Sequence, residues 1–179
     1  MTWNFVAGAA LTADDLNQHL PIFVDKTADE TRTSTTVCTS DTELFVDLLA
    51  GRTYDIELKV SCFAASATPD IKIKWINTGT MTELVARGCL GPSINTTDVE
   101  AVATAATTVG VVRTSTATTL ATEISYGCDG TTVRGLIVEK FTLAVVVAGR
   151  LTMQWAQRAS SASATTITGS SRIIAVPVA

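Results

Sequence analysis

The chain has 179 residues, a length that suits one domain or a compact domain with an arm. Hydrophobic residues make up 46% and charged residues only 17%, which excludes a disordered, highly charged tail. The net charge is −4 and the 13 basic residues are scattered singly. We therefore predict no nucleic-acid partner, because phosphate binding requires clustered Lys and Arg.

The first 24 residues are predicted to form an attachment arm with a short helix. Thr12 is a candidate N-cap and Asp15, three residues later, can complete a capping box. Pro21 ends the helix after about two turns, too short to be stable alone in water. The segment nevertheless carries five large apolar side chains, which we predict to be the attachment residues: Trp3, Phe5, Leu11, Leu16 and Leu20. The alternative is a helix that only caps the domain's own core.

Residues 25–179 are predicted to form a single all-β domain. Threonine, alanine and valine dominate, and β-branched side chains suit a pleated surface. The first predicted strands span 33–38, 43–48, 54–62 and 70–76. The clearest alternation runs from Tyr54 to Cys62, where charged residues face one way and apolar residues the other. That pattern is typical of half-buried antiparallel strands.

The middle of the chain is ambiguous. Residues 98–112 are compatible with an Ala-rich helix or with a loop and a strand, and their Thr and Val content favours the strand. A strand at 121–126 leads to a turn at Asp129-Gly130. The last third is more regular, with strands predicted at 133–147, 151–157 and 165–178. Together these predict an antiparallel β-sandwich or jelly roll of about eight strands.

Alternation also predicts which side chains form the core. Both Trp75 and Trp155 have the inward parity of their strands, so they are interpreted as core rather than as sugar-binding platforms. The predicted inner face comprises Tyr54, Ile56, Leu58, Val60, Ile71, Ile73, Trp75, Leu143, Val145, Leu151, Met153 and Trp155. The four cysteines, Cys38, Cys62, Cys89 and Cys128, are predicted to be buried thiols, although spacing leaves disulfides open.

Catalytic and metal chemistry have little support in the sequence. His19 is the single histidine, and a nucleophile triad would have to be built on the arm. Loop aspartates at 25, 29, 41 and 70 leave calcium open, but turn formation explains them better. We therefore predict a protein that is not an enzyme, with no cofactor, metal or catalytic residue. The residues after Met1 do not have the pattern of a secretory leader, so no export is expected. The longest apolar run, Leu143 to Ala148, is too short to cross a bilayer, so no membrane partner is expected.

Three groups of segments carry a family resemblance. The run from Trp3 through Gly8 to Leu11-Thr12-Ala13-Asp14-Asp15-Leu16-Asn17 resembles the opening of tailed-bacteriophage tail and virion-surface proteins. Residues 149–160, 165–167 and 169–175 resemble the closing hairpin of phage virion proteins with tumour-necrosis-factor-like or complement-component-like jelly rolls. Residues 25–31, 42–48 and 50–54 are similar to actinobacterial-phage minor tail and capsid-surface proteins. The middle of the chain is unmatched, and no motif carries a catalytic residue across.

The resemblance implies a structural virion protein, made in the host cytoplasm and displayed on the particle surface as a capsid decoration or minor tail protein. Its expected partners are other phage structural proteins, such as major capsid or tail proteins. Low charge and a mean hydropathy of +0.32 also favour a homo-oligomer, with a trimer as the first expectation by resemblance. The alternative is a carbohydrate- or receptor-binding module of a phage tail.

Overall fold

A computed structural model describes Thr12 and residues 19–66, 69–92, 110–114, 119–128 and 134–178. Every regular element in these residues is a β-strand, and all strand pairs are antiparallel. No helix in the described part of the chain is long and apolar enough to span a membrane. The predicted all-β class is therefore confirmed.

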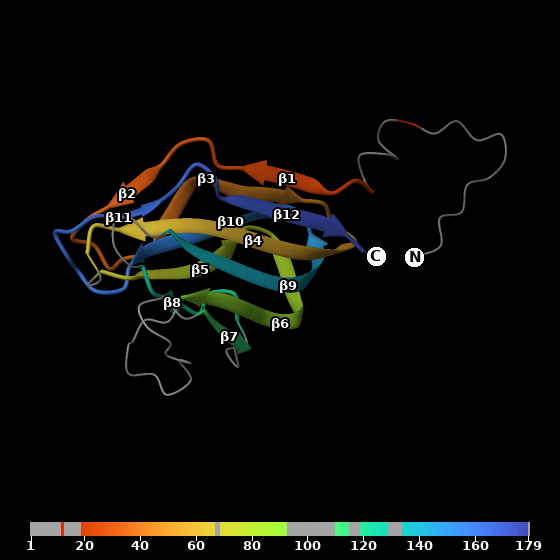
Figure 1. Ribbon diagram of the computed structural model, residues 1–179. Coiled ribbons are helices and arrows are strands. Elements are labelled where there is room, and N and C mark those ends of the chain that lie inside the picture. Colours follow the sequence, from red (N-terminus) through yellow and green to blue (C-terminus); the bar gives the residue numbers. More distant parts are fainter. Residues whose placement is uncertain are drawn as a thin grey trace.

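The strands form two sheets that face each other as a sandwich (Figure 1). The larger sheet runs β1-β12-β4-β9-β6-β7, and β11 pairs with β4 on one side and with β2 on the other. Its strands are β1 (Ile22–Asp25), β2 (Glu30–Arg32), β4 (Arg52–Ala64), β6 (Thr80–Pro92), β7 (Gly110–Thr114), β9 (Gly135–Val147), β11 (Thr165–Ile167) and β12 (Arg172–Pro177). The smaller sheet runs β3-β10-β5-β8, with β3 (Thr39–Leu48), β10 (Gly149–Gln157), β5 (Ile71–Asn77) and β8 (Ile124–Tyr126).

The core lies between the two sheets and follows the alternation of the sequence. In β4, Tyr54, Ile56, Leu58 and Val60 are each at most 2% exposed, while the intervening residues point outward. All twelve residues predicted for the inner face are buried. Trp75 packs edge-on against Phe141 of the facing sheet, with ring centroids 5.2 Å apart. Hydrophobic burial thus joins the two sheets along their length.

Two tight turns carry the chain from one sheet to the other and pack together. Gly79 joins β5 to β6, and Gly149 opens β10 directly after β9. A Cβ at Gly149 would lie 2.0 Å from the Thr78 carbonyl oxygen, and one at Gly79 would lie 2.6 Å from that of Val147. Gly79 also has a positive φ of 78°, which side chains rarely tolerate. Glycine at both turns therefore permits the crossing.

Several sequence expectations are corrected. The N-terminal helix is not borne out, since residues 19–20 form a turn and a bend and residues 13–18, where the helix was expected, lie outside the described residues. The strand expected at 33–38 is irregular, because pairing starts only at β3. The strand expected at 165–178 is two strands separated by a turn at Gly169-Ser170. The described residues hold twelve strands, not about eight.

Candidate functional site

The N-terminal segment enters the sandwich at its edge. Leu20 is 53% exposed and is followed by β1, which pairs with β12 and has no second ladder partner among the described strands. Leu20 is thus the one predicted attachment residue that the structure describes, and its side chain is available to a partner. The other four, Trp3, Phe5, Leu11 and Leu16, lie outside the described residues.

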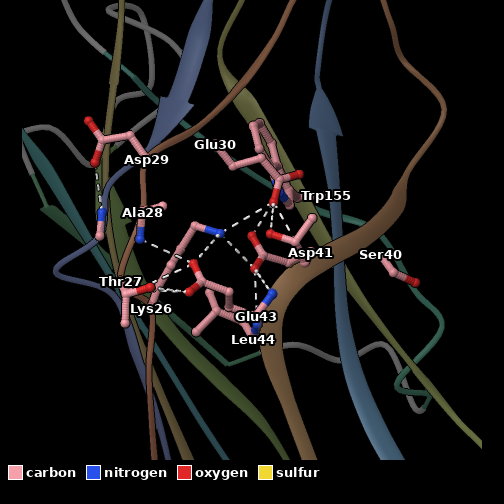
Figure 2. A network of polar contacts seen from close by, with 12 residues as sticks. Lys26, Thr27, Ala28, Asp29, Glu30, Ser40, Asp41, Glu43, Leu44 and Trp155 are labelled. Carbon is pink, nitrogen blue, oxygen red and sulfur yellow. Dashed lines mark hydrogen bonds and ion pairs between the residues drawn. The ribbon is translucent and has the colours of Figure 1, made fainter.

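Directly after β1 a buried lysine draws three carboxylates together (Figure 2). The Lys26 side chain is 1% exposed, and its Nζ lies 2.9 Å from Asp41, 3.3 Å from Glu30 and 3.6 Å from Glu43. Burial alone would lower the pKa of Lys26, but hydrogen bonds and charges from Asp41 and Glu30 raise it. Lys26 therefore stays charged. We call Lys26, Glu30, Arg32, Asp41 and Glu43 the root cluster.

Asp41 connects the root cluster to the core. Its Oδ1 accepts hydrogen bonds from the backbone N–H groups of Glu43 (3.0 Å) and Leu44 (2.9 Å). Its Oδ2 accepts a hydrogen bond from the Trp155 indole nitrogen at 3.2 Å. The carboxylate thus joins the backbone of β3 and the Trp155 side chain of β10 to Lys26. Asp41 thereby fixes the start of β3 against β10.

Glu43 and Asp29 hold the segment between β1 and β2. The Glu43 carboxylate accepts hydrogen bonds from the backbone N–H groups of Thr27 and Ala28 and from the Thr27 hydroxyl. Asp29 accepts one from the Gly169 N–H at 2.8 Å. The Lys26 N–H also donates to the Ser171 carbonyl at 2.8 Å. The chain that follows the arm is consequently tied both to β3 and to the β11–β12 turn.

Arg32 closes the cluster at its outer side. Its guanidinium lies 4.0 Å from the centre of the Trp155 ring and donates to the Thr39 and Ser40 carbonyls. It also donates to Glu30 at 3.1 and 2.5 Å. Burial alone would raise the pKa of Glu30, but the bonds from Arg32 and Thr42 lower it to about 2.

A second buried cluster lies between the sheets at the far side of the sandwich. Glu139 on β9 is fully buried and accepts hydrogen bonds from Trp75 Nε1 at 2.7 Å and the Tyr126 hydroxyl at 2.5 Å. Arg87 on β6 is 2% exposed, and its Nε lies 3.4 Å from Glu139. Burial and the charge of Glu139 raise the pKa of Tyr126, which therefore remains a donor. We call this group the core cluster.

The outer surface of β6 carries an unusual exposed apolar run. Leu84 and Val85 are each 56% exposed, and Ala86 is also exposed. The β6–β9 register shifts on both sides of Val85, so this stretch bulges from the sheet. Val146 and Val147 at the end of the paired strand β9 are 63% and 52% exposed. We call these five residues the β6–β9 patch; it consists of two groups, since Val85 lies opposite Thr142 whereas Val147 lies opposite Thr80.

A shallow hollow of about 390 Å³ adjoins this patch on the outer face of the larger sheet. Val85 lines one side and Ile174 and Val176 of β12 line the other. Its floor carries the ion pair of Glu57 with Lys140. The patch and the hollow together give this face a ridge beside a depression.

The predicted acidic loop residues are not gathered into one site. Asp25 pairs with Arg172, Asp29 with the Gly169 N–H, Asp41 with Lys26, and Asp70 with Arg158 at 3.6 Å. In the part of the chain that is described, no group of three or more His, Cys, Asp or Glu residues is arranged to hold a metal ion. In the root cluster, the Lys26 ammonium supplies the cation to which the carboxylates are drawn. His19 is only partly exposed.

Sequence reasoning missed both clusters and the patch. One signal was available, because Glu139 shares the inward parity of Ile137, Phe141 and Leu143 in a strand predicted correctly. A carboxylate at an inward position must have buried partners. No comparable local signal identified Lys26, whose main partner lies 15 residues away.

Comparisons with known proteins add little. No protein-family model matches the chain, and no curated protein matches it either. Among solved structures, a chain in "Structure of infectious bursal disease virus Gt strain" is similar at a TM-score of 0.24 and 5% identity. The match covers 99% of this chain and 47% of that chain. Such a low TM-score establishes neither a shared fold nor a shared function.

Proposed function

We propose that this protein is a non-enzymatic structural component of a tailed-phage particle. Its N-terminal arm attaches to the particle, and its β-sandwich is displayed at the surface as a capsid decoration or minor tail protein. The sequence resemblance described above motivates this proposal. The observation that carries it is the β6–β9 patch, an exposed apolar run on an otherwise well-alternating sandwich.

The patch is the surface that we assign to contacts between subunits. Three consecutive exposed apolar residues are unfavourable in water unless a partner covers them. Closed symmetry allows identical apolar faces to cover one another, so a homo-oligomer, with a trimer as the first candidate, accounts for their exposure.

The root cluster supports attachment through the arm. An arm that holds a domain on a particle needs a firm connection, since a loose root would make the domain's position indefinite. Lys26 provides that connection because its ion pairs tie the segment after β1 to β3. The folded root therefore begins only a few residues after Leu20.

A carbohydrate-binding module is the less favoured alternative. Sugar-binding faces commonly use exposed aromatic platforms, whereas Trp75 and Trp155 are both 0% exposed. Neither indole is available for stacking, and both indole nitrogens already donate to buried carboxylates. The two tryptophans are therefore assigned to structure.

Deletion of residues 2–20 tests the arm. The truncation leaves β1 and the root cluster intact, so the protein is expected to remain folded and to lose binding to particles. A full-length variant with Trp3 and Phe5 replaced by Ser is the matched control, because it removes two predicted attachment residues without shortening the chain. Normal occupancy of the truncated, folded protein on purified particles would contradict the proposal.

Substitution of Leu84→Ser together with Val85→Thr tests the patch. We expect the oligomer to weaken, as measured by sedimentation at several protein concentrations, while the fold is kept. Val37→Thr, at a 70% exposed position away from β6 and β9, is the control. A wild-type protein that is monomeric both in solution and on particles would overturn the subunit contact. Quantitative mass spectrometry of particles measures the copy number, which distinguishes the capsid from the tail, since a capsid decoration protein has many copies per particle and a minor tail protein few.

A further inference from the structure

Two of the four cysteines meet inside the sandwich. The Sγ atoms of Cys62 and Cys128 lie 2.9 Å apart, and both residues are 0% exposed. A disulfide bond is about 2.05 Å long, so the two sulfurs would have to approach by only about 0.9 Å to bond. Cys62 belongs to the larger sheet, whereas Cys128 follows β8 of the smaller sheet.

Both thiols are held in position by surrounding hydrogen bonds. Cys62 lies in β4 and is paired with Ile167 on one side and with Gly135 on the other. The backbone around Cys128 is also fixed: the Gly127 N–H donates to the Pro92 carbonyl at 2.9 Å, and the Cys128 N–H donates to Asp70 Oδ1 at 3.3 Å. The approach of the sulfurs is therefore set by the backbone of both sheets.

We propose that Cys62 and Cys128 form an intramolecular disulfide that links the two sheets of the sandwich. The bond closes a loop between residues 66 positions apart. Cys38 and Cys89 are expected to remain thiols, since their sulfurs contact the backbone carbonyl oxygens of Lys72 and Arg87 rather than another sulfur. This inference is independent of the proposed function, because it concerns the chain alone.

The oxidant is a small-molecule disulfide, and the reaction is two successive thiol–disulfide exchanges. In the first, one cysteine thiolate attacks the small disulfide, breaks its S–S bond and forms a mixed disulfide, and the released thiolate takes up a proton. In the second, the other cysteine thiolate attacks the protein sulfur of the mixed disulfide and expels the second small thiol. Both cysteines lose their protons, and the small disulfide is reduced to two thiols.

The test is carried out at equilibrium because both sulfurs are buried and exchange in the folded protein is slow. The full chain is unfolded in urea, refolded in reduced and oxidised glutathione, acid-quenched, unfolded and alkylated. Mass spectrometry should then count two alkylated thiols instead of the four seen after reduction, and peptide mapping should join Cys62 to Cys128. Four alkylated thiols, another pairing, or glutathione attached to either cysteine would overturn the proposal.

Two variants sharpen this result. The double variant Cys38→Ser with Cys89→Ser should still form the bond and retain no thiol. Cys128→Ser should retain three thiols in the same buffer. Because the wild-type count decides the question, a variant that fails to fold does not affect it.

Stability gives an independent readout. The chain-entropy model for a loop of this length predicts that oxidation raises Tm by about 10 °C. Reduction with dithiothreitol should reverse the rise. A lower Tm in the oxidised form would show that the bond strains the fold and would count against the assignment.

Discussion

The root cluster and the core cluster bury charge in opposite ways. In the root cluster one ammonium, that of Lys26, is shared by three carboxylates, two of which are partly exposed. In the core cluster one fully buried carboxylate, that of Glu139, is shared by Arg87, Trp75 and Tyr126. The first cluster has an excess of acceptors, and the second has an excess of donors.

This difference corresponds to what each cluster holds together. The root carboxylates accept hydrogen bonds from several backbone N–H groups, including those of Thr27, Ala28 and Leu44, so they fix the path of the chain. Glu139 instead receives side chains from three other strands in both sheets. The root cluster therefore positions the entering segment, whereas the core cluster sets how the two sheets face each other.

The largest loss of stability is expected for Glu139→Ala. The substitution leaves the Arg87 charge buried without its partner and removes the acceptor for Trp75 and Tyr126. Loss of one member of a buried ion pair costs about 3–5 kcal/mol, so the free energy of unfolding should fall by about that amount. Urea denaturation measures it.

Glu139→Gln is the matched control because it keeps the volume and one acceptor oxygen, and its effect should be smaller. The double variant Arg87→Met with Glu139→Leu should recover much of the loss, because no unpaired charge remains. A Glu139→Ala variant as stable as wild type would show that the cluster does not join the sheets.

Lys26→Met should have the second-largest effect. Three carboxylates then lack their common cation, but Glu30 and Glu43 can turn toward water. We expect a loss of about 2–3 kcal/mol in unfolding free energy, less than for the core cluster. Hydrogen exchange should show the lost protection first at residues 27–44.

Lys59→Met is the control for Lys26, since Lys59 is 49% exposed and pairs with Glu57 at the surface. Equal losses for the two lysine variants would indicate that burial of Lys26 contributes nothing.

The sequence predicted the elements whose side chains alternate regularly. Residues 54–62 and 133–147 were identified because their apolar residues recur at every second position, as the burial of β4 and β9 confirms. The 13-residue strand β6 was missed. Its register shifts three times against β9, so its apolar residues do not alternate and Leu84 to Ala86 face solvent together.

The clusters were less predictable than the strands for a related reason. Asp41 is buried three residues before the next buried residue, Leu44, which breaks the period of two in β3. Its partners Lys26 and Trp155 are 15 and 114 residues away. Such partners depend on strand order, and local patterns contain no information about strand order. The attachment residues Trp3, Phe5, Leu11 and Leu16 remain a prediction.

Acidification is expected to have a smaller effect on the free energy of unfolding. In the root cluster, this effect should come from Glu30. Its pKa is held at about 2 in the folded protein and returns to its usual value of 4.5 on unfolding. The unfolded chain therefore takes up the proton first, so the stabilisation is complete above pH 4.5 and is lost as pH falls toward 2.

Urea midpoints measured between neutral and acidic pH test this prediction. The difference in unfolding free energy between wild type and Glu30→Gln should be constant near neutral pH and shrink as the solution is acidified. A difference that does not change with pH would show that Glu30 titrates alike in the folded and unfolded chain.

The smallest loss of stability is expected at an exposed ion pair whose geometry is as good as that of the buried Lys26 pairs. Arg150 donates to both oxygens of Asp47 at 2.8 Å and lies 3.9 Å from the centre of the Phe45 ring. The side chains are 47% and 66% exposed, so water and salt screen their attraction. Asp47→Asn should shift the urea midpoint less than Lys26→Met, and the shift should vanish at high salt. The Lys26→Met shift should persist at high salt, because salt screens buried pairs much less. A salt-resistant loss at Asp47 would mean that hydrogen-bond geometry, rather than burial, determines what these charges contribute, and the contrast between the clusters would need another explanation.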